Sequence, residues 1–500
     1  MPQFKNFSSG FRTNNIDINS LSAGQNVELL KTTYGSNIYR SMGNSSLATI
    51  TGEQIIGGFD YEKGDNHYEL VFTNTGTQSK AYLLVGGTAT LIKSGMSADA
   101  RFFNAVNYNN GAFITNGIDA PFFYEYGATP AVTDVNCTAQ DSSLIRGLAV
   151  KVFDNRIFMG SGHTLYSCGL GDQYDWSSAD VELTRAGYIG NFMNRSSTIT
   201  GIETYKDSLI IHRTTDTVWL SGTSGSYQMK VVSNVGCANP FCIANLDIYQ
   251  LYFLKHINGT GLYYLSSNEL GTIKAESEIS INVHEEFENI DTSRLKEIYV
   301  LPVTAKNEVW IHIPRTDLPS NSYWLIYNLT GKFFQLPRIT QPINSAWLFE
   351  GRIHTGTTDG KVLREDFGET FDGMPITFRA DTQSMDFGSL VKKTITDICM
   401  FTVDMTRQNS FYLSFIREND ESTLQSILID IVPAGALIFA ESDTDTDPRT
   451  FFDDNQFASE TPASKRQGKP SMFRELKVRF SGTGGNIGLI NFELPQATAV

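Results

Sequence analysis

The chain has 500 residues, and 54 Asp and Glu against 39 Lys and Arg give a formal net charge of −15 at pH 7. With 41% hydrophobic and 19% charged residues, it is not a disordered polyelectrolyte, and it can bury a core without disulfide or metal staples. No run of about 18 apolar residues indicates a membrane-spanning helix, and we expect no signal peptide. The net negative charge argues against a surface that binds nucleic acid tightly, but it does not exclude a surface along which nucleic acid slides.

The first 50 residues are polar, rich in Asn, Ser and Gly, and nearly without periodicity. We expect residues 1–50 to form an extended N-terminal arm, a kind of segment that frays unless neighbours hold it. Beyond it, short apolar or alternating runs are bounded by Gly, Asn, Asp and Ser. Because β-branched and aromatic side chains suit a half-buried pleated surface, such runs predict strands. Four clear examples are residues 67–73, 155–160, 207–212 and 308–313.

The strand runs recur in groups of three or four, with a mean spacing of about 48 residues. A period of 40–50 residues is typical of β-propeller blades, because a ring of sheets lets each sheet pack on its neighbours and leaves only short edges. We therefore predict an all-β fold with a β-propeller over residues 51–366, seven blades being favoured and six possible. The expected group starts are Gln54, Arg101, Arg146, Thr198, Phe241, Glu297 and Pro342.

Two further segments complete the expected organisation. Residues 282–297 are the best candidate for a helix in a chain otherwise almost free of 3.6-residue periodicity. From residue 367 the texture changes to longer alternating runs, and we expect residues 367–500 to form a C-terminal antiparallel β-sandwich domain.

Charge is unevenly placed in that C-terminal domain. Residues 418–460 hold eleven acids and one base, whereas residues 461–480 hold six bases and one acid. A solvated loop beside a strand is one interpretation, and a charged subunit contact or channel lining is the sharper one. The residues that would carry the second interpretation are Asp443, Asp445, Asp447, Lys465 and Arg466.

Metal and cofactor signals are weak. Asp443, Asp445 and Asp447 have the spacing of a calcium loop, but Pro448 stands where such a loop needs glycine, so an exposed acidic loop is favoured. The five cysteines are irregularly spaced, and no second pair joins Cys237 and Cys242 in a zinc site. We expect reduced thiols, no bound metal and no cofactor.

Catalytic motifs are also missing from the sequence. It contains no Gly-x-Ser-x-Gly elbow, no phosphate-binding Gly-x-x-x-x-Gly-Lys loop and no His-Glu-x-x-His pattern. Paired carboxylates for glycoside hydrolysis could meet in a propeller mouth, but nothing marks a particular pair. We therefore assign no catalytic residue and expect a protein that is not an enzyme.

Several longer phrases contain residues that we interpret as fold determinants. Asn116-Gly117 predicts a hairpin turn, and Asp119 before Ala-Pro121 starts another turn. Tyr174 and Trp176 are expected to wedge between blades. Trp219, in the middle of a predicted strand, is expected in the propeller core, and Gly236 is grouped with these residues.

The order of these phrases along residues 20–390 resembles the tail hub or nozzle proteins of short-tailed bacteriophages (podoviruses), a group that includes DNA-stabilising tail proteins. The C-terminal residues 390–500 match only as another β-domain. The phrases are FITNGIDAPFFY (113–124), VFDNRIF (152–158), LYSCGLGDQYDW (165–176), AGYIG (186–190), ITGIETYKDSLII (199–211), TVWL (217–220), SNVGCA (233–238) and HTGTTDGKVL (354–363).

The resemblance implies a structural virion protein, made in the host cytoplasm and assembled into the phage tail. It implies a homo-hexameric tube below the portal-adaptor ring that continues and closes the channel for double-stranded DNA, retains the genome and releases it at ejection. It also implies attachment points for tail fibres, spikes or a needle, and DNA contact without sequence specificity. An acidic wall suits this role, because Lys and Arg would bind phosphates and slow sliding.

Two other function classes stay open on sequence alone. A glycan-binding or glycan-cleaving propeller is supported by the aromatic content, 12% of residues, since aromatic faces stack on sugars. It requires paired acids in the propeller mouth, one of them with a raised pKa. A cellular scaffold propeller that binds a partner peptide is the third class.

Overall fold

The structure of the chain is a computed structural model. It divides into two compact units: unit 1 comprises Met1–Gly43, Leu325–Ile339 and Gly368–Val500, and unit 2 comprises Asn44–Trp324 and Thr340–Phe367. The structure describes residues 3–4, 21–32, 35–139, 142–177, 187–191, 197–223, 226–246, 251–255, 260–266, 277–385, 393–395, 400–403, 409–417, 423–431, 463–466, 471–473, 475–485, 487–493 and 497–499.

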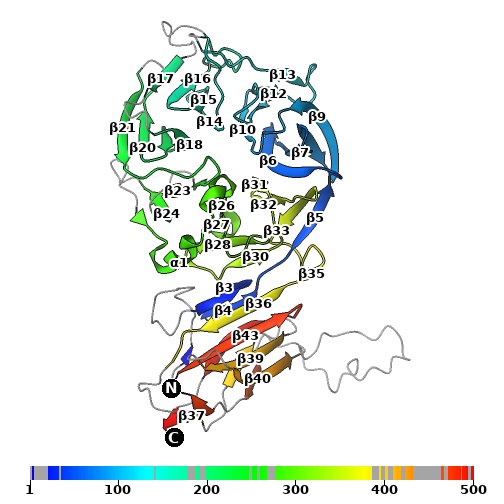
Figure 1. The fold of residues 1–500 in the computed structure, drawn as a ribbon, viewed down its shortest axis with the longest axis vertical. Coiled ribbons are helices and arrows are strands. Elements are labelled where there is room, and N and C mark those ends of the chain that lie inside the picture. The colour runs from blue at the N-terminus through cyan, green and yellow to red at the C-terminus, as the bar shows by residue number, and fades with distance from the viewer. Residues whose placement is uncertain are drawn as a thin grey trace, which may run out of the picture. The chain divides into compact units, whose positions relative to one another are not determined.

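Within the described residues of unit 2, seven antiparallel sheets are arranged in a ring (Figure 1). The first four are β6 (Gln54–Lys63), β7 (Asn66–Asn74), β8 (Ser79–Val85) and β9 (Thr88–Met96); β10 (Asn104–Tyr108), β11 (Gly111–Thr115), β12 (Phe122–Tyr124) and β13 (Val132–Asp134); β14 (Ala149–Phe153), β15 (Arg156–Ser161), β16 (Thr164–Ser167) and β17 (Gly187–Asn191); and β18 (Ile199–Tyr205), β19 (Ser208–Arg213), β20 (Thr217–Ser221) and β21 (Gln228–Ser233).

The other three sheets complete the ring in chain order, except that the last one borrows a strand from an earlier part of the chain. They are β22 (Ile243–Asn245), β23 (Leu251–Leu254), β24 (Leu262–Leu265) and β25 (Ser277–Glu278); β26 (Tyr299–Val303), β27 (Glu308–Ile313) and β28 (Ser322–Asn328); and β31 (Ser345–Phe349), β32 (Arg352–Gly356), β33 (Lys361–Glu365) and β5 (Asn44–Thr49).

The first strands of the seven sheets form the inner ring. Each contacts the first strand of the next sheet, in the order β6, β10, β14, β18, β22, β26 and β31, and β31 contacts β6 again. A closed cycle of small antiparallel sheets around an axis is a β-propeller. The predicted all-β propeller is therefore confirmed, and its described sheets number seven.

The ring closes through β5. This strand precedes the first sheet in the chain but pairs antiparallel with β33 in the last one, from Asn44 opposite Glu365 to Thr49 opposite Lys361. Asn44 Nδ2 also donates to the buried Glu365 Oε1 at 3.0 Å. Because β5 and β33 lie some 300 residues apart, this pairing joins the N-terminal and C-terminal ends of the propeller sequence within its last sheet.

Neighbouring blades pack through continuous apolar clusters. Phe72 of the first blade stacks on Phe103, which leads into the second, with ring centroids 4.5 Å apart and an interplanar angle of 6°. At the junction of the last and first blades, a Cβ on Gly58 would lie 2.2 Å from the Trp347 ring. Only glycine lets β6 approach that indole, because any side chain would collide with it.

Unit 1 contains two larger antiparallel sheets and a small one, together with short strands of its middle segments. The larger sheets are β2 (Leu21–Gln25), β36 (Thr377–Thr382), β43 (Leu476–Thr483), β39 (Asn409–Arg417) and β40 (Thr423–Ile431); and β3 (Val27–Thr32), β4 (Gly35–Arg40), β44 (Gly488–Glu493), β38 (Met400–Val403) and β41 (Ala463–Arg466), with β1 (Gln3–Phe4) on β44. The others are β42 (Ser471–Phe473), β37 (Lys393–Ile395), β45 (Ala497–Ala499), β34 (Thr370–Phe371), β35 (Met374–Pro375), β29 (Phe333–Phe334) and β30 (Arg338–Thr340).

The expected boundaries 1–50, 51–366 and 367–500 therefore differ from the units of the structure. Strands within residues 1–50 belong to both units: β1 to β4 complete the sheets of unit 1, and β5 completes the propeller. Sequence analysis missed these strands because residues 1–50 are polar overall and because the hydrogen-bond partners of the strands lie hundreds of residues away. Local periodicity says nothing about such pairing.

The predicted helix over 282–297 is present only in pieces. A 3₁₀ turn, Ile281–Val283, leads into α1 (His284–Glu288), and a second 3₁₀ segment, Thr292–Glu297, follows. The Asp291 side chain accepts from the Ser293 amide and caps that segment at 3.0 Å. Asp291 is an N-cap residue by type, so it favours the start of a new helical segment here, whereas α1 already ends at Glu288.

A buried carboxylate joins two strands of unit 1. Asp381 on β36, 0% exposed, accepts from Arg479 on β43 at 2.9 Å through Nε and Nη2, and from Arg379 Nε at 3.0 Å. Burial alone would raise the pKa of Asp381, but the hydrogen bonds from both arginines outweigh it and hold that pKa below its usual value of 3.8.

We expect Asp381→Asn to lower the free energy of unfolding of unit 1 by about 1–2 kcal/mol at pH 7, a modest loss because both arginines can reach water. A carboxylate whose folded-state pKa is depressed contributes stability above its unfolded pKa and loses it as pH falls through the folded value. Urea unfolding of wild type and variant should therefore differ at pH 7 and converge as the pH falls through the lowered pKa of Asp381. A difference that persists at low pH would contradict this assignment.

Candidate functional site: the central cavity of the propeller

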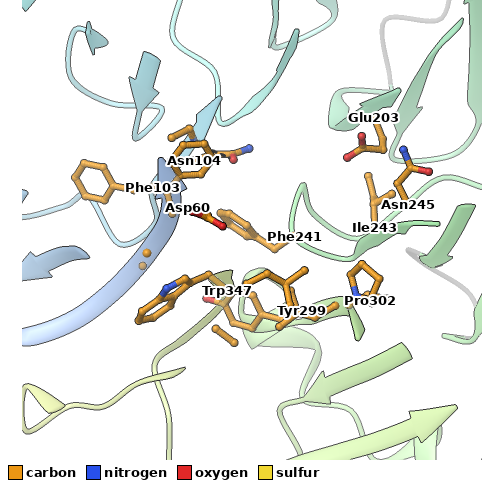
Figure 2. Close-up of a pocket in the computed structure, with 18 of the residues that line it drawn as sticks. Asp60, Phe103, Asn104, Glu203, Phe241, Ile243, Asn245, Tyr299, Pro302 and Trp347 are labelled. Carbon is orange, nitrogen blue, oxygen red and sulfur yellow. Dashed lines mark hydrogen bonds between the residues drawn. The ribbon is translucent and has the colours of Figure 1, made fainter. Parts of the chain in front are cut away.

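The propeller encloses a cavity of about 340 Å³ on its axis, and all seven first strands contribute to its lining. Figure 2 shows that side chains from opposite sides of the ring converge on it, among them Asp60, Asn104, Glu203 and Tyr299. Inward-facing residues of the inner strands thus meet here because the ring is closed. We refer to this space as the central cavity.

One side of the central cavity is polar. Lys151 on β14 and Glu203 on β18 form an ion pair at 2.5 Å that joins two adjacent blades. Asn104 Nδ2 donates to the Leu148 carbonyl at 2.9 Å, and Asn245 Nδ2 donates to the Thr204 carbonyl at 2.6 Å. These polar side chains hold neighbouring inner strands together, so a structural role accounts for most of them.

The other side of the central cavity is aromatic. Phe241 and Tyr299 pack with ring centroids 5.6 Å apart, and the Trp347 indole nitrogen donates to the buried Glu69 Oε1 at 2.9 Å. Burial raises the pKa of Tyr299, which keeps this phenol neutral. Trp347 is only 5% exposed, so its ring is committed to packing rather than offered to a ligand.

The size of the central cavity limits what can pass along the axis. At about 340 Å³ it lies at the small end of the range for ligand pockets, which is about 300–1,000 Å³. A DNA duplex, one helical turn of which is about 34 Å long, occupies far more space than that.

Two acids line the central cavity, and each contacts a basic side chain. Asp60 Oδ1 lies 2.9 Å from His67 Nδ1, and Glu203 pairs with Lys151. The general acid of a glycosidase sits instead in an apolar pocket that raises its pKa. The arrangement thus offers no specific support for the glycan-cleaving alternative.

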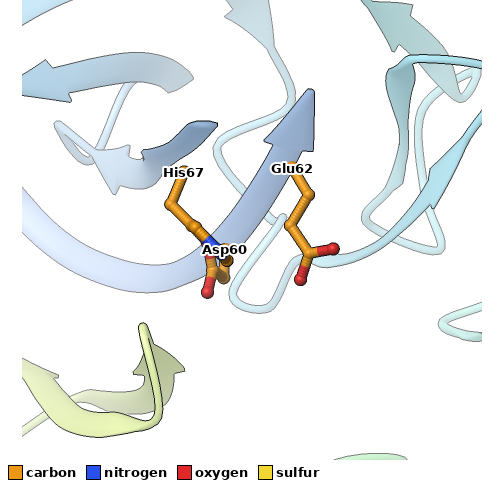
Figure 3. A group of neighbouring side chains, drawn as sticks. All are labelled: Asp60, Glu62 and His67. Carbon is orange, nitrogen blue, oxygen red and sulfur yellow. The ribbon is translucent and has the colours of Figure 1, made fainter. Parts of the chain in front are cut away.

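The Asp60 carboxylate belongs to a small group on one face of the β6–β7 hairpin (Figure 3). Glu62 lies directly opposite His67 in the register, and the ligand atoms of Asp60, Glu62 and His67 lie within 4.8 Å of one another. The hydrogen bond that His67 Nδ1 donates to the Asp60 carboxylate raises the pKa of His67 above its usual value. In the described part of the chain this is the one group with spacing suited to a shared metal ion, and the ion pair accounts for it without one.

The predicted turn residues lie together between β11 and β12. Gly117 has φ +74°, a conformation that favours glycine. The Asn116 Oδ1 accepts from the amides of Ile118 and Asp119, and its Nδ2 donates to the Asp119 carboxylate at 2.7 Å. Asp119 therefore belongs to the same loop rather than starting another turn, and it also accepts from the Ser97 amide at 2.9 Å.

The three predicted aromatic residues have different surroundings. Trp176, 4% exposed, stacks on Phe113 of the preceding blade with centroids 5.7 Å apart, so it wedges between blades. Tyr174 is 45% exposed and touches Phe123 only edge-on, at 6.0 Å. Trp219 is half-buried rather than in the core, because strand alternation gives the inward positions of β20 to its neighbours Val218 and Leu220.

Gly236 lies where two chain segments touch, and a Cβ there would be 1.6 Å from the Arg213 carbonyl oxygen. The predicted contact charges are placed only in part. Lys465 and Arg466 lie on β41, opposite Phe401 and Met400. Asp443, Asp445 and Asp447 lie outside the described residues, as does most of the acidic stretch that contains them.

No protein-family model and no curated protein matches the chain. Among solved structures, it is similar to the computationally designed Ika8 protein (TM-score 0.38, 9% identity, 64% of this chain and 99% of that one). It is also similar to the Pan2 WD40 domain of Neurospora crassa (TM-score 0.41, 6% identity, 66% of this chain and 98% of that one). None of the described helices is both long and apolar enough to cross a membrane.

Sequence reasoning did not find the residues that line the central cavity. Asp60, Lys151 and Glu203 sit in three different blades, so no local motif contains them. A usable signal existed only at the hairpin, where Asp60 and Glu62 precede a Gly64 turn and His67 follows it. Alternation about that turn places all three on one face.

Proposed function

We propose that the chain is a structural, non-enzymatic protein of a short-tailed phage tail: a nozzle or hub that assembles as a hexamer below the portal-adaptor ring. In this role it continues and closes the DNA channel, retains the packaged genome and releases it at ejection. Tail fibres, spikes or a needle attach to it. The observation that carries the proposal is the order of the family-like phrases, which in this fold fall on successive strands and turns of the propeller, from β11 to β33.

Two physical features support the proposal. The central cavity, at about 340 Å³, has the size of a small-molecule pocket rather than of a duplex channel, and a hexamer would place the DNA between its copies. The net charge of −15 per chain disfavours tight phosphate binding along such a channel, so DNA would slide rather than stick.

We expect six copies of the purified chain, near 333 kDa in all, to assemble either alone or on portal-adaptor rings, whose mass they would raise by that amount. Native mass spectrometry gives the mass, and negative-stain imaging shows whether the particle is a six-fold tube with a bore wide enough for a duplex. The matched control is the same chain without portal-adaptor rings, which separates self-assembly from templated assembly. A monomer that ignores the rings would overturn the proposal.

A further inference from the structure

A second cavity of about 300 Å³ lies beside the starts of several first strands of the propeller. Its lining includes three basic residues, Arg101, Arg146 and Lys296, and one acid, Asp99. Phe102, which also lines it, has its ring centroid 6.2 Å from that of Phe241 in the central cavity. We call this space the basic pocket.

The bases of the basic pocket lack counter-ions. Across the described residues, Arg101 and Lys296 make no ion pair or side-chain hydrogen bond, and both are exposed. Arg146 donates through Nη1 to the carbonyls of Ile145 at 2.9 Å and Cys137 at 3.4 Å, which orients the guanidinium but leaves its charge unbalanced. By contrast, Arg294 in the same 3₁₀ segment as Lys296 is paired with Glu297.

This concentration of charge runs against the rest of the molecule. Three bases and Asp99 give the basic pocket a formal charge of +2, whereas the whole chain carries −15. Like charges gathered around one cavity repel each other, and an anion that enters the cavity relieves that repulsion. We propose that the basic pocket binds a phosphate-bearing ligand, with Arg101, Arg146 and Lys296 as its cationic contacts.

The residue types favour phosphate over a single carboxylate. An arginine presents a planar fork of donors that meets two oxygens at once, and a lysine adds a compact point charge. Two arginines and a lysine around one cavity can contact several oxygens of one group. A diphosphate supplies those oxygens and a charge that matches +2 better than one carboxylate does.

The test uses the full chain and pyrophosphate as the probe, with isothermal titration calorimetry at low ionic strength. We expect one site per chain, and binding at least tenfold weaker in the Arg101→Gln/Lys296→Gln double variant. Both side chains are exposed and unbonded among the described residues, so the variant should keep the fold of the wild type, which circular dichroism and thermal melting check. The matched control is Arg352→Gln, an exposed arginine on β32 that does not line the basic pocket.

Further arms identify the source of the phosphate and test selectivity. The second probe is a 5′-phosphorylated DNA duplex. If the duplex binds in a way that depends on Arg101 and Lys296 while pyrophosphate does not bind, the phosphate belongs to nucleic acid and the proposal is supported. Binding that is absent in both arms, unchanged in the double variant, or matched by citrate would overturn it. The result does not depend on hexamer formation, so failure of the tail proposal and failure of this one are distinguishable.

Discussion

Replacing Glu69 with alanine is expected to lower the free energy of unfolding of the propeller by about 3 kcal/mol. Glu69, on β7 of the first blade, accepts through Oε1 from Trp347 Nε1 at 2.9 Å and contacts His354 Nδ1 at 2.6 Å, both in the last blade. All three side chains are about 5% exposed or less. Removing the carboxylate leaves two buried donors unpaired and a cavity where the ring closes, which costs far more than the loss of a surface contact.

The effect is measured by urea unfolding at pH 7 followed by tryptophan fluorescence. The matched control is Glu125→Ala, which removes a carboxylate from a solvent-accessible pair with Lys63 and should cost far less. Glu69→Gln, which keeps an acceptor oxygen at nearly the same volume, should lie between the two. Equal unfolding midpoints for Glu69→Ala and Glu125→Ala would show that this contact does not stabilise the closed ring.

Much of the propeller follows from local sequence patterns. The expected group starts fall within three residues of the observed first strands; Gln54 coincides with the start of β6, and Thr198 precedes β18 by one residue. Each blade is a meander of consecutive strands, so the residues that determine its strands, turns and spacing are neighbours in the sequence. Closure is different, because β5 pairs with a strand some 300 residues away and its polar sequence NSSLAT gives no local sign of it.

The candidate sites were less predictable than the fold for the same reason. Turn chemistry at Asn116-Gly117 is local, and the structure places both residues in a turn. The ion pair of Lys151 and Glu203 joins residues 52 positions apart, and the basic pocket brings Arg101 together with Lys296. Only the closed ring brings such residues together. Composition therefore gives the net negative charge of the chain but cannot show that the basic pocket is locally positive.

Acidification from pH 7 to pH 4 is expected to destabilise the propeller by several kcal/mol through two buried histidines. His212 is 0% exposed, and burial lowers its pKa to about 3. Burial also lowers the pKa of His312 to about 4, against a smaller raising effect of its 2.8 Å contact with the Glu297 carbonyl. In the unfolded chain both histidines would bind a proton near pH 6.5. The unfolded state therefore binds more protons than the folded state between pH 7 and pH 4, and the free energy of unfolding decreases as the pH is lowered.

The hydrogen bonds of His212 explain why the folded state resists protonation. Thr217 Oγ1 donates to the Val235 carbonyl at 2.6 Å, so at its 2.8 Å contact with His212 Nδ1 it accepts. The neutral ring therefore carries its proton on Nδ1. Nε2 is buried with no partner in the described structure, and a second proton there would be an unpaired buried charge.

His212→Asn keeps a donor near the Nδ1 position but does not titrate. It should therefore weaken the dependence of the free energy of unfolding on pH between pH 7 and pH 4. We expect it to remove roughly 3 kcal/mol of the loss between pH 7 and pH 4, whatever its cost at neutral pH. Urea unfolding at half-unit pH steps gives the slope. His284→Asn is the matched control, because that side chain is 48% exposed, whereas His212 is fully buried. If the free energy of unfolding of His212→Asn falls with the same slope as that of the wild type between pH 7 and pH 4, the buried ring is not what makes the propeller acid-sensitive.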